Sequence, residues 1–286
     1  MDTMMDETTP AGGEPGAAPV KPEKKEESFL VFVVKLALIV LVFRSFIFSP
    51  FNIPSESMLP RLENGDYLLA AKWPYGFSSY SLPFSVPLIP GRILPHQPKQ
   101  GEIVIFKAPP DAKVDWIKRV IGLPGDQIQV TNGVLSINGT PVPKVRIADA
   151  EIPVSPNTPC YQQRLEPFRS YEVRAADGTR MCRYPQFRET LPNGVSYNVL
   201  DLENGPGDNT PPYVVPEDHL FLMGDNRDNS MDSRFSTAEG GISFVPQENL
   251  VGRATIMMFS TDGSAEWLKP WTWFTAARWK RIGGTF

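Results

Sequence analysis

This sequence of 286 residues has few histidines, few cysteines and no excess of basic charge. Its two histidines, His96 and His219, lie in a proline-rich loop and in a strand pattern, where neither is favoured as a general base. A triad of serine, histidine and carboxylate is therefore not expected. The net charge of −4 and the lack of a basic patch argue against nucleic acid as a partner.

The two cysteines, Cys160 and Cys182, have neither the CxxC spacing nor the spacing of a zinc site. No metal and no cofactor is expected. If the body of the chain lies in an oxidising compartment, a disulfide between these two cysteines is expected, and two unpaired thiols are the alternative.

The sequence has a single long apolar run, residues 29–48, which reads FLVFVVKLALIVLVFRSFIF. A run of about 20 apolar residues is what a bilayer crossing needs. Its Phe, Leu, Val and Ile side chains favour insertion by roughly 4–8 kcal/mol, which exceeds the cost of Lys35, about 2.5–3.5 kcal/mol. We predict a retained transmembrane helix; a buried core helix and a cleavable signal peptide are the alternatives. Because Lys21, Lys24 and Lys25 precede the run, the N-terminus is expected in the cytoplasm and the body across the membrane.

The 30 prolines and 22 glycines, with short strand-like segments between turns, predict a mainly β protein after the apolar run. Residues 1–28 are polar and acidic, and they are expected to be a disordered cytoplasmic tail. The other expected parts are a transmembrane helix (29–48), a β core (49–126 and 217–266), an inserted loop-rich β subdomain (127–216) and a basic, Trp-rich tail (267–286).

Two aromatic segments leave a choice between packing and lipid contact. Residues 73–95 are rich in aromatics and proline and carry almost no charge. They form either a hairpin packed on the core or an apolar flap in contact with lipid. Residues 267–286 combine tryptophan with basic residues, and they form either a helix packed on the body or an amphipathic helix on anionic lipid.

Chemistry is most strongly indicated by residues 54–60, PSESMLP, close behind the apolar run. A serine attacks only when a base takes its proton. With histidine scarce, lysine is the other option, but an ordinary lysine of pKa near 10.4 is neutral in about one molecule in 2,500 at pH 7. Burial that lowers the pKa to about 8 makes roughly one in ten neutral, at a cost of about 3 kcal/mol. Lys118, on one face of an apolar strand with Trp116 and Val120, fits this requirement; a lysine that reaches solvent at the strand edge is the alternative.

Three longer motifs stand in order along the chain: PSESMLP at Pro54–Pro60, KRVIGLPGD at Lys118–Asp126 and GDNRDNSMDSR at Gly224–Arg234. Together they resemble the motifs of bacterial type I signal peptidases (leader peptidases), which are membrane-anchored endopeptidases with a Ser/Lys dyad. A fourth motif, at Gly101–Phe106, matches less closely. The resemblance implies a signal-peptidase-like β catalytic core.

The resemblance also implies roles for single residues. Ser57 is the expected nucleophile, Lys118 the general base, Ser55 a donor to the oxyanion, and Ser230 the residue that orients the lysine. The residues expected to line shallow substrate pockets for small side chains are Phe51, Ile53, Met58, Leu62, Trp116 and Ile117. Structural support, with an ion pair between the last two, is expected from Asp225, Arg227, Asp232 and Arg234. Glu56, between the two serines, is expected to point to solvent.

The implied function is cleavage of signal peptides from exported preproteins after small-x-small residues. The implied location is the inner (cytoplasmic) membrane, with one span and an extracytoplasmic catalytic part. Exported preproteins and membrane lipid are the expected partners, and a monomer is expected. Two alternatives stay open: a specialised peptidase for one pilus or conjugation protein, and an anchored β domain that binds partners without catalysis.

Overall fold

The computed structural model describes residues 28–162, 170–266 and 268–286. Its helix α1 (Phe29–Phe46) has a mean hydropathy of 2.5 over 18 residues, which is long and apolar enough to cross a membrane. Leu, Val, Ile and Phe without Gly or Pro favour this helix, and its apolar side chains surround the axis, as in a membrane span. It is shorter than the predicted span 29–48, because Phe48 already begins strand β1. The predicted disordered tail lies, up to residue 27, outside the described residues.

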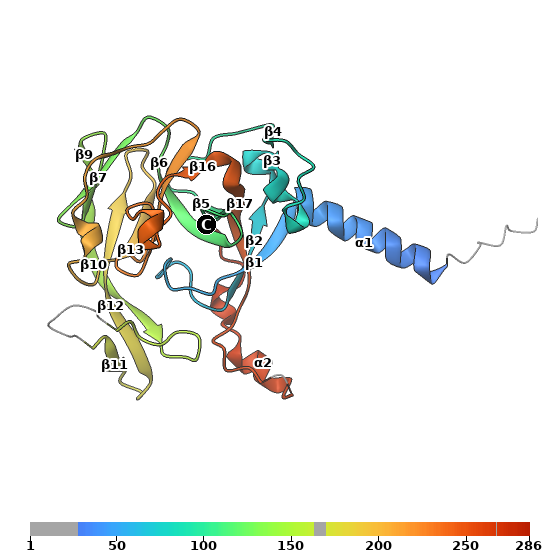
Figure 1. The fold of residues 1–286 in the computed structure, drawn as a ribbon. Helices are drawn as coiled ribbons and strands as arrows, with labels where there is room; N and C mark the ends of the chain where they lie inside the picture. The colour runs from blue at the N-terminus through green and yellow to red at the C-terminus, as the bar shows by residue number, and fades with distance from the viewer. Residues whose placement is uncertain (1–27, 163–169, 267) are drawn as a thin grey trace, which may run out of the picture. The chain divides into compact units, whose positions relative to one another are not determined.

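The chain divides into two units between Leu38 and Ile39, and every strand among the described residues belongs to the second. Within that unit, a central sheet of seven antiparallel strands has the order β1-β2-β17-β5-β6-β15-β16 (Figure 1). These strands are β1 (Phe48–Asn52), β2 (Asp66–Ala71), β5 (Ile103–Lys107), β6 (Asp115–Gly122), β15 (His219–Met223), β16 (Val245–Pro246) and β17 (Leu250–Ser260). The prediction of a mainly β protein is confirmed.

The side chains of strand β5 show why the middle of this sheet is buried on both faces. Its Ile103 and Ile105 belong to one buried apolar cluster, and its Val104 and Phe106 belong to another. Alternate side chains of a strand point to opposite faces, so β5 is covered on both sides. Val104 is the register partner of Lys118 on β6, and this pairing brings the lysine into the apolar interior.

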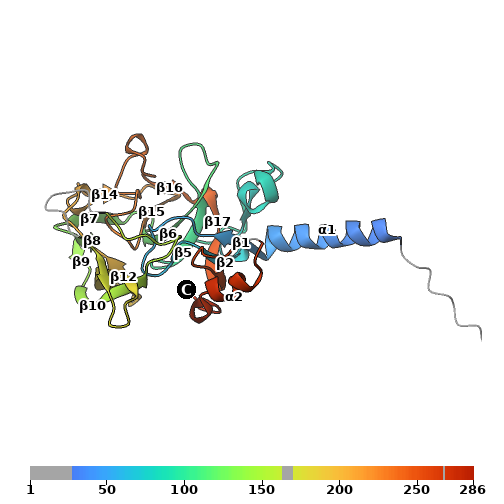
Figure 2. The ribbon, with the colours of Figure 1, turned by 90° about the horizontal axis from the view of Figure 1, so that it is seen from below.

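Residues 127–214 supply two further sheets of four strands each. One contains β7 (Gln127–Thr131), β8 (Val134–Ile137), β9 (Thr140–Pro141) and β14 (Tyr213–Val214). The other contains β10 (Lys144–Pro153), β11 (Glu172–Arg174), β12 (Arg180–Thr190) and β13 (Ser196–Leu200). Figures 1 and 2 both place these sheets at the end of the β body away from β1 and β2.

The inserted sheets share their core with the central sheet. Ile121 and Phe221 of the central sheet pack in one buried cluster with Ile128 and Leu135 of the insert. In addition, Cys160 and Cys182 are joined by a disulfide that connects a loop to β12. The insert is therefore part of the same compact unit as the central sheet.

The aromatic segment 73–95 is packed on the core at its base and exposed at its tip, and its contact with lipid stays a prediction. Its base is a short hairpin of β3 (Phe77–Ser78) and β4 (Arg92–Ile93), and the Arg92 guanidinium donates to the Glu248 and Leu250 carbonyls at 2.8 and 2.6 Å. The base is thus packed on the core. Its tip is not, because Phe84 is 99% exposed.

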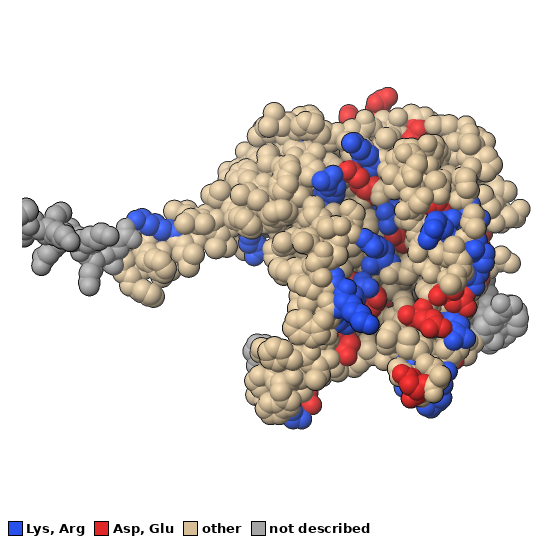
Figure 3. All heavy atoms as spheres, turned by 180° about the vertical axis from the view of Figure 1, so that it is seen from behind, with Lys and Arg blue, Asp and Glu red and all other residues tan. Residues whose placement is uncertain are grey.

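The C-terminal segment likewise divides into two parts. Arg278 and Arg281 form ion pairs with Glu63 and Asp66 of the β body, and this fixes the last residues against the core. The short helix α2 (Trp271–Ala276) instead exposes large aromatic side chains. On the face of the β body shown in Figure 3, basic and acidic side chains lie intermixed.

Candidate active site

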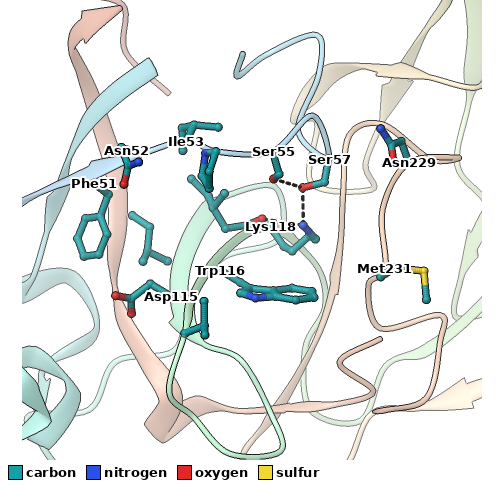
Figure 4. Close-up of a pocket in the computed structure, with 14 residues that line it drawn as sticks. Phe51, Asn52, Ile53, Ser55, Ser57, Asp115, Trp116, Lys118, Asn229 and Met231 are labelled. Atoms are coloured by element: carbon teal, nitrogen blue, oxygen red, sulfur yellow. Dashed lines mark hydrogen bonds between the residues drawn. The ribbon is translucent and has the colours of Figure 1, made fainter. Parts of the chain in front are cut away.

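Ser57 and Lys118, 61 positions apart in the chain, meet inside the β body. Lys118 Nζ lies 2.6 Å from Ser57 Oγ and also donates to the Ile117 carbonyl at 3.1 Å (Figure 4). Both residues are buried. A nucleophile in direct hydrogen-bond contact with a candidate base is the arrangement that serine activation needs.

The surroundings of Lys118 favour its neutral form. Burial lowers the pKa of Lys118 to about 8, against the opposing carboxylates of Asp232 and Asp225 and with a smaller contribution from the Arg234 guanidinium. At that pKa roughly one molecule in ten carries a neutral amine at pH 7. The Trp116 ring, with its centroid 5.4 Å from Nζ, forms part of the apolar wall.

A closed loop presents Ser57. The Ile53 N–H donates to the Asp66 carbonyl at 2.8 Å, and the Gly65 N–H donates to the Ile53 carbonyl at 3.0 Å, so the loop is tied at its base. Gly65 has a φ of +89°, the left-handed region that glycine adopts at low cost. The turn at Asn64 and Gly65 therefore sets the length of the serine loop.

Ser55 lies at the open side of the same loop. Its hydroxyl is 3.3 Å from Ser57 Oγ (Figure 4). In the described part of the chain, the Ser57 backbone N–H forms no hydrogen bond. A free N–H and a nearby hydroxyl are the two kinds of donor that stabilise an oxyanion.

The segment 224–234 holds the serine loop from the other side. Asn226 N–H donates to the Ser57 carbonyl at 3.1 Å, and its side chain donates to the Glu56 carbonyl at 3.2 Å. A Cβ on Gly224 would lie 2.5 Å from the Ser57 carbonyl oxygen and 2.3 Å from Ser230 Oγ. Only glycine permits this close approach.

The predicted ion pair between Asp232 and Arg234 is formed, with Arg234 Nε 2.9 Å from Asp232 Oδ1. Both side chains are buried, and Asp232 also accepts the Gly224 N–H at 2.9 Å. Despite the opposing effect of burial, the Arg234 guanidinium lowers the pKa of Asp232. A permanent negative charge therefore lies near Lys118.

Asp225 and Arg227 are the other two residues expected to give structural support, and the sequence did not indicate their partners. Asp225 accepts two hydrogen bonds from Arg119, at 2.7 and 2.6 Å, and Arg227 pairs with Glu189 at 2.6 Å. All four side chains are buried. Arg119 follows Lys118 on β6, so one strand carries both the candidate base and the anchor of the segment 224–234.

Ser230 lies close to the dyad but does not bond to it. It is buried, and its hydroxyl lies close enough to Asp232 to help lower the pKa of that carboxyl, but it forms no well-aligned hydrogen bond within the described residues. The expected hydrogen bond to Lys118 is absent, because Nζ is directed to Ser57 and the Ile117 carbonyl. The orienting role of Ser230 stays a prediction.

A cavity of about 530 Å³ opens beside the dyad. Of the residues predicted for the substrate pockets, Phe51, Ile53, Trp116 and Ile117 line it. The other lining residues are Asn52, Pro54, Ser55, Ser57, Ile105, Val114, Asp115, Lys118, Asn229 and Met231. Figure 4 shows Phe51, Asn52 and Asp115 on one side of the dyad and Asn229 and Met231 on the other.

Two predicted pocket residues have a different position. Met58 and Leu62 are fully buried and do not line this cavity. They lie on the inner side of the serine loop, in the apolar cluster that also contains Leu68. Among the missed lining residues, Asn229 and Met231 flank Ser230 in the third motif, which was the one signal that could have indicated them.

The prediction that Glu56 points to solvent is also wrong. It does not point freely to solvent but is half-buried, and its Oε2 accepts a hydrogen bond from the Asn229 side chain at 3.1 Å. Burial raises the pKa of Glu56, and the bond from Asn229 opposes this rise. Its charge is not among those that shift the pKa of Lys118.

A family model described as signal peptidase, peptidase S26, matches residues 27–259. The chain belongs to the signal peptidase I family. Similar relatives are the signal peptidases I of Rickettsia typhi (strain ATCC VR-144 / Wilmington) and Rickettsia conorii (strain ATCC VR-613 / Malish 7). Each is 36% identical over 250 residues; the match covers 84% of this chain and 82% and 81% of the relatives. A crystal structure of a signal peptidase I from Enterococcus faecalis V583 matches 56% of this chain and 98% of that chain, with 22% identity and a TM-score of 0.28. A TM-score this low supports no argument about the fold.

Membership of the signal peptidase I family makes this protein a serine peptidase, and signal peptidases act on preproteins. The apolar helix α1 is consistent with a membrane anchor.

Proposed function

We propose that this signal peptidase I is a membrane-anchored endopeptidase in which Ser57 and Lys118 form the catalytic dyad, and that it cleaves after small-x-small residues. One observation carries the proposal: the buried Lys118 amine, 2.6 Å from the Ser57 hydroxyl. Its lowered pKa makes a neutral amine available near neutral pH, and a neutral amine can take the serine proton.

In the proposed reaction, Ser57 Oγ attacks the scissile carbonyl while its proton moves to Lys118 Nζ. The new oxyanion accepts hydrogen bonds from the Ser57 N–H and the Ser55 hydroxyl, which together contribute several kcal/mol. The Lys118 ammonium then protonates the leaving amine, and an acyl-enzyme on Ser57 remains. Lys118 next takes a proton from water, which attacks the ester; when the ester bond breaks, Lys118 gives this proton to Ser57 Oγ and the second product leaves.

The neighbouring segment supports the dyad in this scheme. Ser230, buried beside the dyad with no hydrogen bond to Ser57 or Lys118, is available to accept a hydrogen bond when Nζ turns during proton transfer. Asp232, fixed by Arg234, stabilises the ammonium that forms transiently. These are positioning roles, since neither side chain contacts Ser57 Oγ through a hydrogen bond.

The proposed preference for small side chains rests on the walls of the cavity next to Ser57. Ile53 and Ile117 are buried and Trp116 lies below the dyad in Figure 4, so the space directly beside Ser57 is bounded by large apolar groups. We expect a methyl group to pack against such walls and a longer side chain to be accepted less well.

We further infer that the catalytic part lies outside the cytoplasm, with the N-terminus inside. The lysines that precede α1 favour this orientation. The disulfide between Cys160 and Cys182 supports it, because disulfides persist in oxidising compartments.

The test uses the full chain in an uncharged detergent and a preprotein with Ala at the first and third positions before the cut. Ser57→Ala should abolish cleavage, whereas Ser264→Ala, an exposed serine far along the chain, should cleave at the wild-type rate. Replacing either Ala of the substrate by Leu should stop cleavage by the wild-type protein. Cleavage by Ser57→Ala at more than a trace rate would refute the dyad, and efficient cleavage of the Leu substrates would refute the pocket assignment.

A further inference from the structure

A second cavity, of about 320 Å³, lies next to the substrate cavity, and more positive than negative side chains line it. Its wall includes three cationic side chains, Arg44, Lys72 and Lys107, and one carboxylate, Asp115. Lys107 Nζ lies 3.0 Å from that carboxylate, so this pair neutralises itself. Arg44 and Lys72 are left with two positive charges that no carboxylate pairs with in the described part of the chain.

Lys72 is the more unusual of the two cations. It is only 3% exposed, and its amine has no hydrogen-bond acceptor or ion-pair partner among the described residues. Its Nζ lies 5.7 Å from the centroid of the Phe51 ring, which is a weak substitute for an anion. Burial lowers the pKa of Lys72 to about 8, and Asp115 opposes this only in part. A buried cation without a counter-ion is costly unless a ligand supplies the negative charge.

The surroundings of the cavity indicate where such an anion comes from. Arg44 lies in the last turn of α1, and the cavity wall also includes residues 82–85 of the aromatic segment. In that segment Phe84 is 99% exposed and Leu88 is 75% exposed. Exposed apolar side chains at the end of an apolar helix, beside basic ones, are typical of the boundary between acyl chains and lipid headgroups.

We propose that this cavity binds the phosphate of an anionic phospholipid headgroup, held by Lys72 and Arg44. The assignment rests on the membrane-spanning role proposed above for α1. An anionic headgroup fits better than a zwitterionic one, because the single carboxylate of the cavity is already occupied by Lys107. The hydroxyls of Tyr80 and Ser85, which also line the cavity, are further donors to phosphate oxygens.

The site adjoins the substrate cavity, since Phe51, Asn52 and Asp115 line both. A bound headgroup therefore contacts the strand β1 that forms one wall of the substrate cavity. The same contact fixes the β body at a defined height relative to the lipid phosphates.

The test is native mass spectrometry of the full chain released from micelles of an uncharged detergent that contain dioleoylphosphatidylglycerol or dioleoylphosphatidylcholine. We expect the phosphatidylglycerol adduct to form at least about tenfold more readily than the phosphatidylcholine adduct. Lys72→Met and Arg44→Gln should each weaken it by about tenfold or more, as expected when one partner of a charge pair is removed. The matched control is Lys99→Met, which removes the same charge from an exposed position and should change binding by less than about twofold.

Several outcomes would overturn the proposal. Equal binding of the two lipids would refute an anionic headgroup, and an equal loss in Lys99→Met would show only general charge attraction. A third arm adds inorganic phosphate: if phosphate alone displaces the lipid at equal concentration, the cavity is a site for free anions and not for lipid. Because Arg44 is exposed, its variant tests the site even if Lys72→Met fails to fold. The readout does not use cleavage, so loss of the dyad proposal and loss of this one are distinguishable.

Discussion

Lys118 and Lys72 are two buried lysines of one β body, and burial lowers the pKa of each to about 8. They differ in the groups that lie next to their amines. Lys118 Nζ bonds to the Ser57 hydroxyl and the Ile117 carbonyl, with Asp232 and Asp225 close enough to raise its pKa. Lys72 Nζ meets the face of an aromatic ring.

The difference teaches that a lowered pKa does not by itself make a catalytic base. A base must also lie within hydrogen-bond reach of the proton that it takes. Lys118 satisfies both conditions, since its register on β6 places it opposite the serine loop. Lys72 satisfies only the first, and its charge is suited to holding an anion.

The largest expected effect separates the two lysines by cleavage. Lys118→Met should lower the rate of cleavage of a soluble signal-peptide substrate by at least about a thousandfold, because the serine loses its base. Lys72→Met should lower it by less than about tenfold, since its amine does not contact Ser57. The measurement is kcat/KM in an uncharged detergent. Similar losses in the two variants would break the distinction.

The second effect is on stability and should be shared by both lysines. Each folded-state pKa, about 8, lies below the unfolded value of 10.5, so the unfolded chain binds more protons between these values. The free energy of unfolding therefore rises with pH across this window, by up to about 3 kcal/mol for each lysine.

Replacing either lysine by Met removes the buried charge. At pH 7, Lys118→Met and Lys72→Met should each raise the unfolding temperature, by an amount that corresponds to about 1–3 kcal/mol. The gain should vanish near pH 10.5. Thermal unfolding in one fixed detergent, with the exposed Lys99→Met as control, measures it. A gain in the control equal to that of the buried sites would mean that burial is not the cause.

A third effect concerns the pH dependence of cleavage. The active form of Lys118 is the neutral amine, so kcat/KM should rise from pH 7 to pH 9 by about tenfold, with a midpoint near 8. Lys72→Met should keep this midpoint. A midpoint that shifted in the Lys72→Met variant would show that the pH profile reports the titration of Lys72 and not that of Lys118.

The smallest expected effect comes from Glu56→Gln. Glu56 adjoins Ser57 in the sequence, but its side chain is bonded to Asn229, and the carboxylates that raise the pKa of Lys118 are those of Asp232 and Asp225. Glutamine can still accept the bond from Asn229, so kcat/KM should change by less than about threefold. A shift of the pH midpoint by more than about half a unit would show that this carboxylate acts on Lys118 after all.

Local features of the chain were predictable from the sequence. The apolar run predicted α1, because a helix satisfies its own backbone within one segment. The apolar pattern around Lys118 predicted the strand β6 that holds this lysine. Each of these properties depends on neighbours within a few residues.

The sequence by itself also determined which chemistry was available: two serines in one short motif, scarce histidine, and one lysine in an apolar strand. Only the tertiary structure decided which side chains meet. The pairing of Asp225 with Arg119, the burial of Met58 away from the cavity and the burial of Lys72 without a counter-ion all arise from segments that are distant in the sequence. The physical reason is that burial and long-range pairing depend on strand register and packing across the whole sheet, which no short stretch of chain encodes.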